Sequence, residues 1–288
     1  MDHRLAELLR LLDLERLEIN IFRGESRDIG SPQVYGGQVL GQALQAAYAT
    51  VDAARVVHSL HAYFLRRGDF NAPIVYFVDR SRDGHSFTSR RVTAIQHGEQ
   101  IFNLSASFQA PEEGFNHQLE MPRVPFPEEL PATPTFGLGA TEVLAPRLRR
   151  FAYDRPIEFR AVPADAATQV TGAPQQYLWI RTVDQLPADD RLHRCLLAYA
   201  ADFHLLGTAL LPHEHTVGAG DMAIASIDHA MWFHRPVRMD DWLLYATDSP
   251  SASGARGFTR GSLFTRTGSL VASTAQEGLI RVLNSATP

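Results

Sequence analysis

One segment occurs twice in this chain, and the repeat constrains the fold more than any other feature of the sequence. The motif Leu-Gly-x-Ala-Leu spans residues 40–44 and returns at residues 206–210. Farther on, His61-Ala62 matches His229-Ala230, and Gly98 matches Gly268. The matches keep their order, so the sequence predicts two copies of one folding unit.

Polar side chains stand at three matched positions of the second copy only. Asp202, Ser226 and Gln276 align with Gly36, His58 and Ala106 of the first copy, respectively. A carboxylate, a hydroxyl and an amide on one side of a duplication predict one reactive copy and one scaffold copy.

The middle of the chain has a different composition from either copy. Six of the 17 prolines fall between residues 111 and 134, together with two Glu-Glu pairs. Such a stretch is typical of an extended linker. We therefore predict a first domain over residues 1–110, a proline-rich linker over residues 111–150 and a second domain over residues 151–288.

Each half has the pattern of one long helix and several antiparallel strands, after a short amphipathic helix at the N-terminus. A helix is predicted in each copy, over residues 39–48 and 191–211. The predicted strands of the first half are 19–24, 57–66, 74–79, 88–96 and 101–109, and those of the second half are 157–162, 177–183, 223–234, 242–248, 257–266 and 270–282. This order is an α+β pattern, and joining two such sheets edge to edge would remove an exposed strand edge from each.

Composition excludes several classes of function. A net charge of −5 argues against general nucleic-acid binding, and the absence of lysine excludes Schiff-base chemistry. The single cysteine, Cys195, cannot form an intramolecular disulfide. The N-terminal stretch has the pattern of an amphipathic helix and not of a signal peptide, so a reducing, cytoplasmic compartment is the default expectation. No apolar run approaches transmembrane length, so no membrane partner is expected.

Several strings of residues, in order along nearly the whole chain, resemble the type II acyl-CoA thioesterases, the TesB family of double-hotdog enzymes. The resemblance rests on residues 34–38 (Val-Tyr-Gly-Gly-Gln), 83–87 (Asp-Gly-His-Ser-Phe), 227–236 (Ile-Asp-His-Ala-Met-Trp-Phe-His-Arg-Pro), 253–258 (Ser-Gly-Ala-Arg-Gly-Phe) and 272–278 (Ala-Ser-Thr-Ala-Gln-Glu-Gly). It implies two tandem hotdog folds, each an antiparallel sheet wrapped around a long central helix.

The resemblance also implies an activity and its residues. The family's Asp, Ser or Thr, and Gln fall on Asp202, Ser226 and Gln276, the three positions that the repeat singles out. A carboxylate can act as general base for water, while a hydroxyl and an amide orient that water toward a thioester carbonyl. The implied reaction is hydrolysis of medium- to long-chain fatty acyl-CoA by a homodimer or homotetramer, with no cofactor because coenzyme A belongs to the substrate.

Four residues are candidates for substrate binding. Gly36 and Gly37 precede the first-half helix, where backbone N–H groups could approach a developing oxyanion, although glycines there could equally serve helix packing. His58, aligned with Ser226, could line the same cavity, and a buried structural histidine is the competing interpretation. Arg256 could bind a phosphate of coenzyme A, although a solvated arginine is the ordinary interpretation.

Three alternatives are less favoured by the sequence. A metal site around His213-Glu214-His215 or the pair His229 and His234 lacks a completing ligand set, so none is predicted. A hotdog enoyl-CoA hydratase or dehydratase needs an acid and a base facing one substrate, but Asp202 and His204 would lie about 200° apart on a helix. A non-catalytic acyl-CoA-binding protein would keep the pocket and lose the polar trio, which is intact in this sequence.

Overall fold

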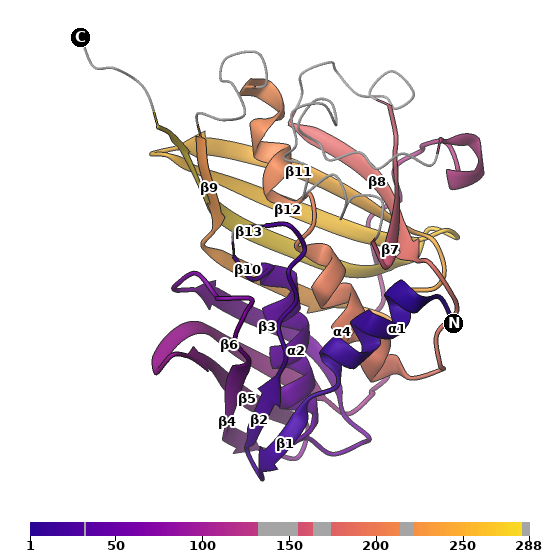
Figure 1. Ribbon diagram of the computed structural model, residues 1–288. Coiled ribbons are helices and arrows are strands. Elements are labelled where there is room, and N and C mark those ends of the chain that lie inside the picture. Colours follow the sequence, from indigo (N-terminus) through magenta and orange to yellow (C-terminus); the bar gives the residue numbers. More distant parts are fainter. Residues whose placement is uncertain (32, 132–154, 164–173, 214–221, 284–288) are drawn as a thin grey trace.

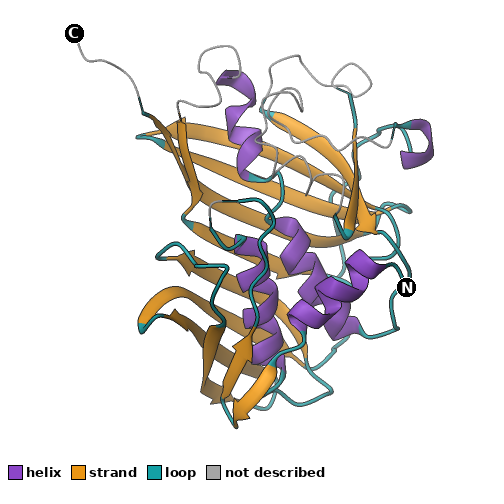
Figure 2. Ribbon diagram, in the orientation of Figure 1, coloured by secondary structure: helices purple, strands orange, loops and turns teal. Residues whose placement is uncertain are grey.

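One antiparallel sheet holds all the strands of the described chain and curves around a layer of helices (Figures 1 and 2). The computed structural model describes residues 1–31, 33–131, 155–163, 174–213 and 222–283. In the first half the elements are α1 (His3–Leu12), β1 (Glu15–Glu18), β2 (Ile21–Gly24), α2 (Gly36–Tyr48), β3 (Val56–Phe64), β4 (Ile74–Asp83), β5 (Phe87–Gln96) and β6 (Glu99–Gln109). They continue with η1 (Pro127–Glu129), β7 (Ile157–Ala161), β8 (Gln175–Thr182), α4 (Asp190–Ala201), η2 (Leu206–His213), β9 (Met222–Ser226), β10 (Asp228–Phe233), β11 (Leu243–Ser253), β12 (Arg256–Thr265) and β13 (Leu270–Val282).

The strand order shows the duplication directly. The sheet runs β1-β2-β4-β5-β6-β3-β10-β13-β12-β11-β8-β7, so each half repeats one order outward from the centre. The halves join where β3 pairs with β10, which places Asp228 opposite Tyr63 and Trp232 opposite Ser59. The edge-to-edge junction of two α+β units is thus confirmed.

The matched histidines of the repeat are out of register by one residue. His229 lies opposite Ala62, and Ala230 lies opposite His61. Residues directly opposite one another in an antiparallel pair share a face of the sheet. His229 is therefore buried with Ala62 while His61 is exposed, so the two histidines point to opposite faces. Matching them by sequence was wrong, because a slip of one residue in a strand reverses every side chain.

Helix α2 lies across the first-half strands, and small residues let α4 approach it closely. Alanine and leucine side chains along α2 are fully buried, and the helix packs on β4, β5 and β6. A Cβ atom on Gly41 would lie 3.2 Å from the Cys195 carbonyl oxygen of α4. This close packing brings the end of α4 to the beginning of α2.

The predicted second-half helix over residues 191–211 is interrupted. Helix α4 ends at Ala201, Asp202 is its C-cap, and the chain resumes as the 3₁₀ segment η2, which packs on β11 and β12 as α2 packs on its own sheet. Between them His204 adopts a φ of +64°, a left-handed conformation that an α-helix cannot accommodate. The helical-wheel angle predicted for Asp202 and His204 was therefore wrong.

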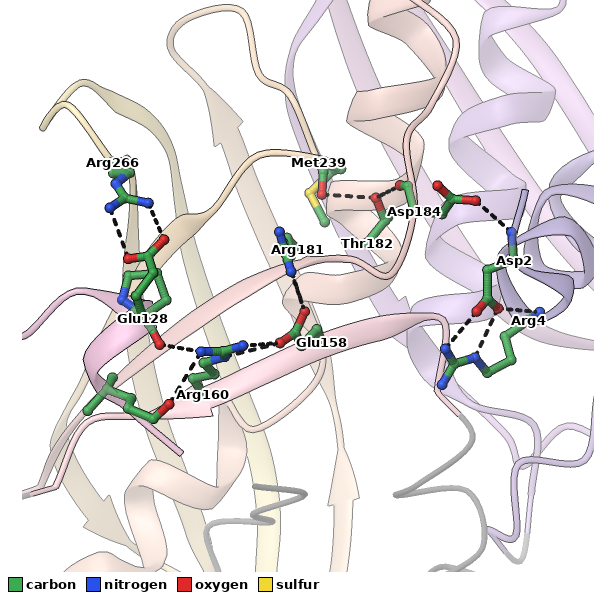
Figure 3. A network of polar contacts seen from close by, with 12 residues as sticks. Asp2, Arg4, Glu128, Glu158, Arg160, Arg181, Thr182, Asp184, Met239 and Arg266 are labelled. Carbon is green, nitrogen blue, oxygen red and sulfur yellow. Dashed lines mark hydrogen bonds and ion pairs between the residues drawn. The ribbon is translucent and has the colours of Figure 1, made fainter. Parts of the chain in front are cut away.

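The described part of the linker lies against the second-half sheet. Trp179 is fully buried and donates its indole N–H to the Pro125 carbonyl at 2.9 Å. Arg160 donates to the Pro127 carbonyl, and Arg266 pairs with Glu128 (Figure 3). These contacts tie residues 125–128 to strands β7, β8 and the end of β12. The predicted domain boundaries stay a prediction, because part of the linker lies outside the described residues.

The segment Asp190–His213 corrects one expectation from the sequence. By length and apolar composition it would pass for a membrane span, contrary to the prediction that no such run exists. Most of it is buried inside the fold as α4 and η2. Its apolar character is that of a core segment.

Candidate active site

Asp202, Ser226 and Gln276 lie together, although they come from three separate elements. Asp202 follows α4, Ser226 ends β9, and Gln276 lies within β13. The Gln276 Nε2 group donates to Ser226 Oγ at 2.6 Å and to Asp202 Oδ1 at 3.2 Å. The Ser226 hydroxyl donates to the same Oδ1 at 3.5 Å. The structure thus brings together the three residues that the repeat singled out; their catalytic roles stay a prediction.

Helix capping, strand pairing and burial position the three residues. Asp202 is the C-cap of α4, and the left-handed conformation of His204 two residues later ends the helix there. Ser226 is held opposite Gly278 by the pairing of β9 with β13. Gln276 is almost fully buried, and its backbone carbonyl accepts a hydrogen bond from the Thr259 hydroxyl at 3.2 Å.

The pKa of Asp202 is raised above its ordinary value because burial disfavours the carboxylate. Hydrogen bonds donated by Gln276, by the Gly37 backbone N–H and by Ser226 favour the ionised form and oppose this shift. A carboxylate with a raised pKa is a stronger base than an ordinary aspartate. Such a group suits proton abstraction.

Gly36 and Gly37 begin α2 directly against Asp202. A Cβ atom on Gly36 would lie 2.6 Å from Asp202 Oδ2, and one on Gly37 would lie 2.2 Å from the Tyr199 carbonyl oxygen. The Gly37 N–H donates to Asp202. Both glycines are thus required by close packing, and the helix N-terminus serves the carboxylate in this structure.

A cavity of about 230 Å³ opens beside the trio. Ser226 and Gly36 lie on its wall, and apolar side chains such as Val39, Phe64 and Phe102 complete that wall. Arg66 and Arg67 also line it. The cavity therefore joins Ser226, one member of the trio, to an apolar surface and to two cations.

His58 does not lie with the trio. Ser226 precedes the Asp228–Tyr63 pair, whereas His58 lies beyond the Trp232–Ser59 pair, at the other end of the junction between β3 and β10. His58 instead contacts Ser107 Oγ at 2.8 Å and lines a different cavity, near residues 112–119. The prediction that His58 lines the Ser226 cavity was wrong, because β3 and β10 pair antiparallel and therefore place matched positions of the two copies at opposite ends of the junction.

Arg256 is also separate from the cavity. It lies at the turn into β12 and pairs with Glu277, with Nε to Oε1 at 2.9 Å. It is not among the residues of the cavity wall that holds Ser226. Nothing in this position supports the predicted contact with coenzyme A.

His229 belongs to the site and was missed as such by the sequence. Its Nδ1 lies 3.0 Å from Gln276 Oε1, and the side chain is 1% exposed. Burial lowers the pKa of His229, which favours the neutral imidazole. The signal was available, since His229 alternates with Met231 and Phe233, which both face the core.

Metal ligands do not gather in the described residues. No group of three or more His, Cys, Asp or Glu side chains in that part of the chain could hold an ion. His213 lies at the end of η2, while Glu214 and His215 lie outside the described residues. The predicted absence of a metal or a separate cofactor stays a prediction.

Fold and site together define a class, the double-hotdog hydrolases with an Asp-Ser-Gln site. A hotdog protein from Alicyclobacillus acidocaldarius superposes with a TM-score of 0.78 at 19% identity, over 96% of this chain and 98% of that chain, and supports the fold alone. The family described as "Acyl-CoA thioesterase" matches residues 148–279, and "Acyl-CoA thioesterase N-terminal domain" matches residues 23–109.

The chain belongs to the acyl-CoA thioesterase family. It is 44% identical to "Acyl-CoA thioesterase 2" of Haemophilus influenzae, over 98% of this chain and 99% of that protein. The structure of an acyl-CoA thioesterase II, TesB2, from Mycobacterium marinum is 44% identical, with a TM-score of 0.83 over 97% of this chain and 100% of that one. The resemblance inferred from the sequence is confirmed.

Proposed function

We propose that the protein hydrolyses fatty acyl-CoA thioesters and that Asp202 is the general base. The observation that carries the mechanism is the convergence of Ser226 and Gln276 on one oxygen of the Asp202 carboxylate, beside a cavity. Membership of the acyl-CoA thioesterase family supports the reaction itself.

The reaction needs only water and the groups already described. Asp202 takes a proton from water while the water oxygen attacks the thioester carbonyl carbon. Ser226 and Gln276 orient that water, which turns a diffusive encounter into a positioned one. The C–S bond then breaks, the coenzyme A thiolate takes up the proton, and the fatty acid leaves. General-base catalysis of this kind contributes ~10²–10⁴-fold.

Arg67 is the residue we assign to the coenzyme A phosphates. It is exposed and lines the cavity that holds Ser226, and no ion pair occupies its guanidinium in the described structure. Its neighbour Arg66 is held by Glu99 at 3.1 Å and by the Gln100 carbonyl at 2.7 Å. A free guanidinium can bind phosphate oxygens in a bidentate manner.

The acyl chain is proposed to be of medium to long length. The apolar wall around Val39, Phe64 and Phe102 supports an aliphatic substrate. Each methylene buried on binding contributes about 0.8 kcal/mol, so affinity should rise with chain length until the pocket is filled.

A homodimer or homotetramer is part of the proposal. Large side chains such as Tyr63, Phe77 and Trp232 are 53%, 41% and 37% exposed, and exposed apolar surface of this kind favours association. We also propose a cytoplasmic location, supported by a single buried cysteine, Cys195, that forms no disulfide.

A hydratase remains the weaker candidate. Asp202 does have a histidine nearby, His229, but Gln276 engages the Nδ1 of that histidine and its Nε2 is buried. The family match favours hydrolysis.

Purified protein incubated with acyl-CoAs from hexanoyl to palmitoyl tests the function. The proposal predicts free thiol and free fatty acid in equal amounts. Absence of thiol at every chain length refutes hydrolysis, and hydration of an enoyl-CoA without thiol release would favour the alternative.

A further inference from the structure

His229 contacts the site through one partner, the Gln276 side chain. It lies on β10, next to β13, and its Nδ1 meets Gln276 Oε1 at 3.0 Å. Within the described residues its Nε2 is buried and has no hydrogen-bond partner. The side chain thus has a single polar contact, and that contact is with a residue of the trio.

A glutamine amide has two chemically different ends, and the site works with only one arrangement. Gln276 Nε2 must donate to Asp202 Oδ1 and Ser226 Oγ, as it does here. Turned over, the amide would set its oxygen against the carboxylate, where both atoms are acceptors. A donor fixed at Oε1 favours the productive arrangement.

We propose that His229 is a positioning residue, whose Nδ1–H holds the Gln276 amide so that Nε2 faces Asp202 and Ser226. The neutral imidazole carries one proton, and the contact with a carbonyl oxygen assigns that proton to Nδ1. Because His229 acts through Gln276, its loss lowers the rate of hydrolysis and leaves acyl-CoA binding largely intact. The proposal rests on the hydrolytic function proposed above.

Two matched substitutions distinguish the loss of the hydrogen-bond donor at Nδ1 from a change in the size of the side chain. The amide nitrogen of asparagine reaches the place of a histidine Nδ1, whereas that of glutamine extends toward the place of Nε2. His229→Asn therefore keeps the donor to Gln276 Oε1, and His229→Gln does not. We expect kcat to fall by about tenfold in His229→Gln and to stay within about threefold in His229→Asn, with KM little changed in both.

A double-mutant cycle with Gln276→Ala completes the test. If His229 acts through Gln276, adding His229→Gln to Gln276→Ala lowers kcat no further. Thermal unfolding of each variant shows which of them are folded, and the comparison is made among folded variants. The Asn and Gln substitutions keep a polar side chain, so they test the proposal even where an apolar replacement would not fold.

Three results would overturn the proposal: a full kcat in His229→Gln, equal losses in the Asn and Gln variants, or losses that multiply in the double variant. Each of these can be obtained only if the wild type releases thiol. Failure of the positioning role is therefore distinct from failure of the hydrolytic function, in which the wild type itself would be inactive.

Discussion

Gly36→Ala should disable catalysis by displacing the base. The added Cβ would lie 2.6 Å from Asp202 Oδ2 and 3.0 Å from the Phe64 ring. Ordinary van der Waals contact begins at 3.4 Å, so the carboxylate or the start of α2 must shift by about 0.8 Å. A misplacement of ~1 Å can cost ~10²-fold in rate. We therefore expect kcat for a medium-chain acyl-CoA to fall ~10²-fold, followed as thiol release at saturating substrate.

Gly207→Ala is the matched control. Gly207 is the second residue of η2, which packs on the second-half sheet as α2 packs on the first, and a Cβ there meets no atom within 4 Å. Its kcat should equal that of the wild type. The reasoning is refuted if Gly36→Ala retains wild-type kcat while remaining folded, or if Gly207→Ala loses activity to the same extent.

Three further predictions concern pH, substrate binding and the linker. The raised pKa of Asp202 should move the acid limb of kcat/KM above the pH at which an ordinary aspartate ionises; a limb at the ordinary position contradicts this. The same raised pKa stabilises the folded protein at pH values below the unfolded-state pKa of Asp202, and this stability is lost as pH rises through the folded-state pKa. The Tm of the wild type should therefore decline relative to that of Asp202→Asn over this pH range. Arg67→Gln should raise KM for acyl-CoA several-fold but not KM for an acyl-pantetheine, which lacks the nucleotide phosphates. Arg256 pairs with Glu277, so Arg256→Gln should change neither KM. Equal effects of Arg67→Gln on both substrates would exclude a phosphate contact. Trp179→Phe removes the indole donor to Pro125 and should cost about 1–3 kcal/mol in denaturant unfolding with unchanged kcat; unchanged stability would mean that the linker is not anchored there.

The sequence alone predicts the two-copy architecture and the trio, because both are encoded in the order of local patterns. Hydrophobic alternation locates most strands, and the repeat isolates Asp202, Ser226 and Gln276. These residues are 24 to 74 positions apart, yet the structure brings them within hydrogen-bond distance.

Strand register and local backbone conformation could not be predicted from the sequence. The His-Ala match placed His61 and His229 on one face, but a shift of one residue reverses the face of every side chain in a strand. His58 was misplaced because the antiparallel pairing of β3 with β10 sets matched positions of the two copies at opposite ends of the junction. The break after α4 was missed because the helical pattern of residues 191–211 continues across it, and the left-handed conformation of His204 that marks the interruption leaves no local signal in the sequence.

The linker shows a different limit. Its prolines correctly indicated a segment without regular strands in the described residues, apart from the turn η1. Composition says nothing of what an extended chain lies against. The contact of Pro125 with the buried Trp179 depends on tertiary packing that no local pattern encodes.

The kcat of Asp202→Asn tests the central claim most directly. Asparagine keeps the shape of the side chain and loses the basic carboxylate, so the hydrogen bonds from Gln276 and Ser226 retain an acceptor while water loses its base. Thiol release from a medium-chain acyl-CoA should fall by at least ~10²-fold in a folded variant. A folded Asp202→Asn protein that turns over at the wild-type rate would contradict the account.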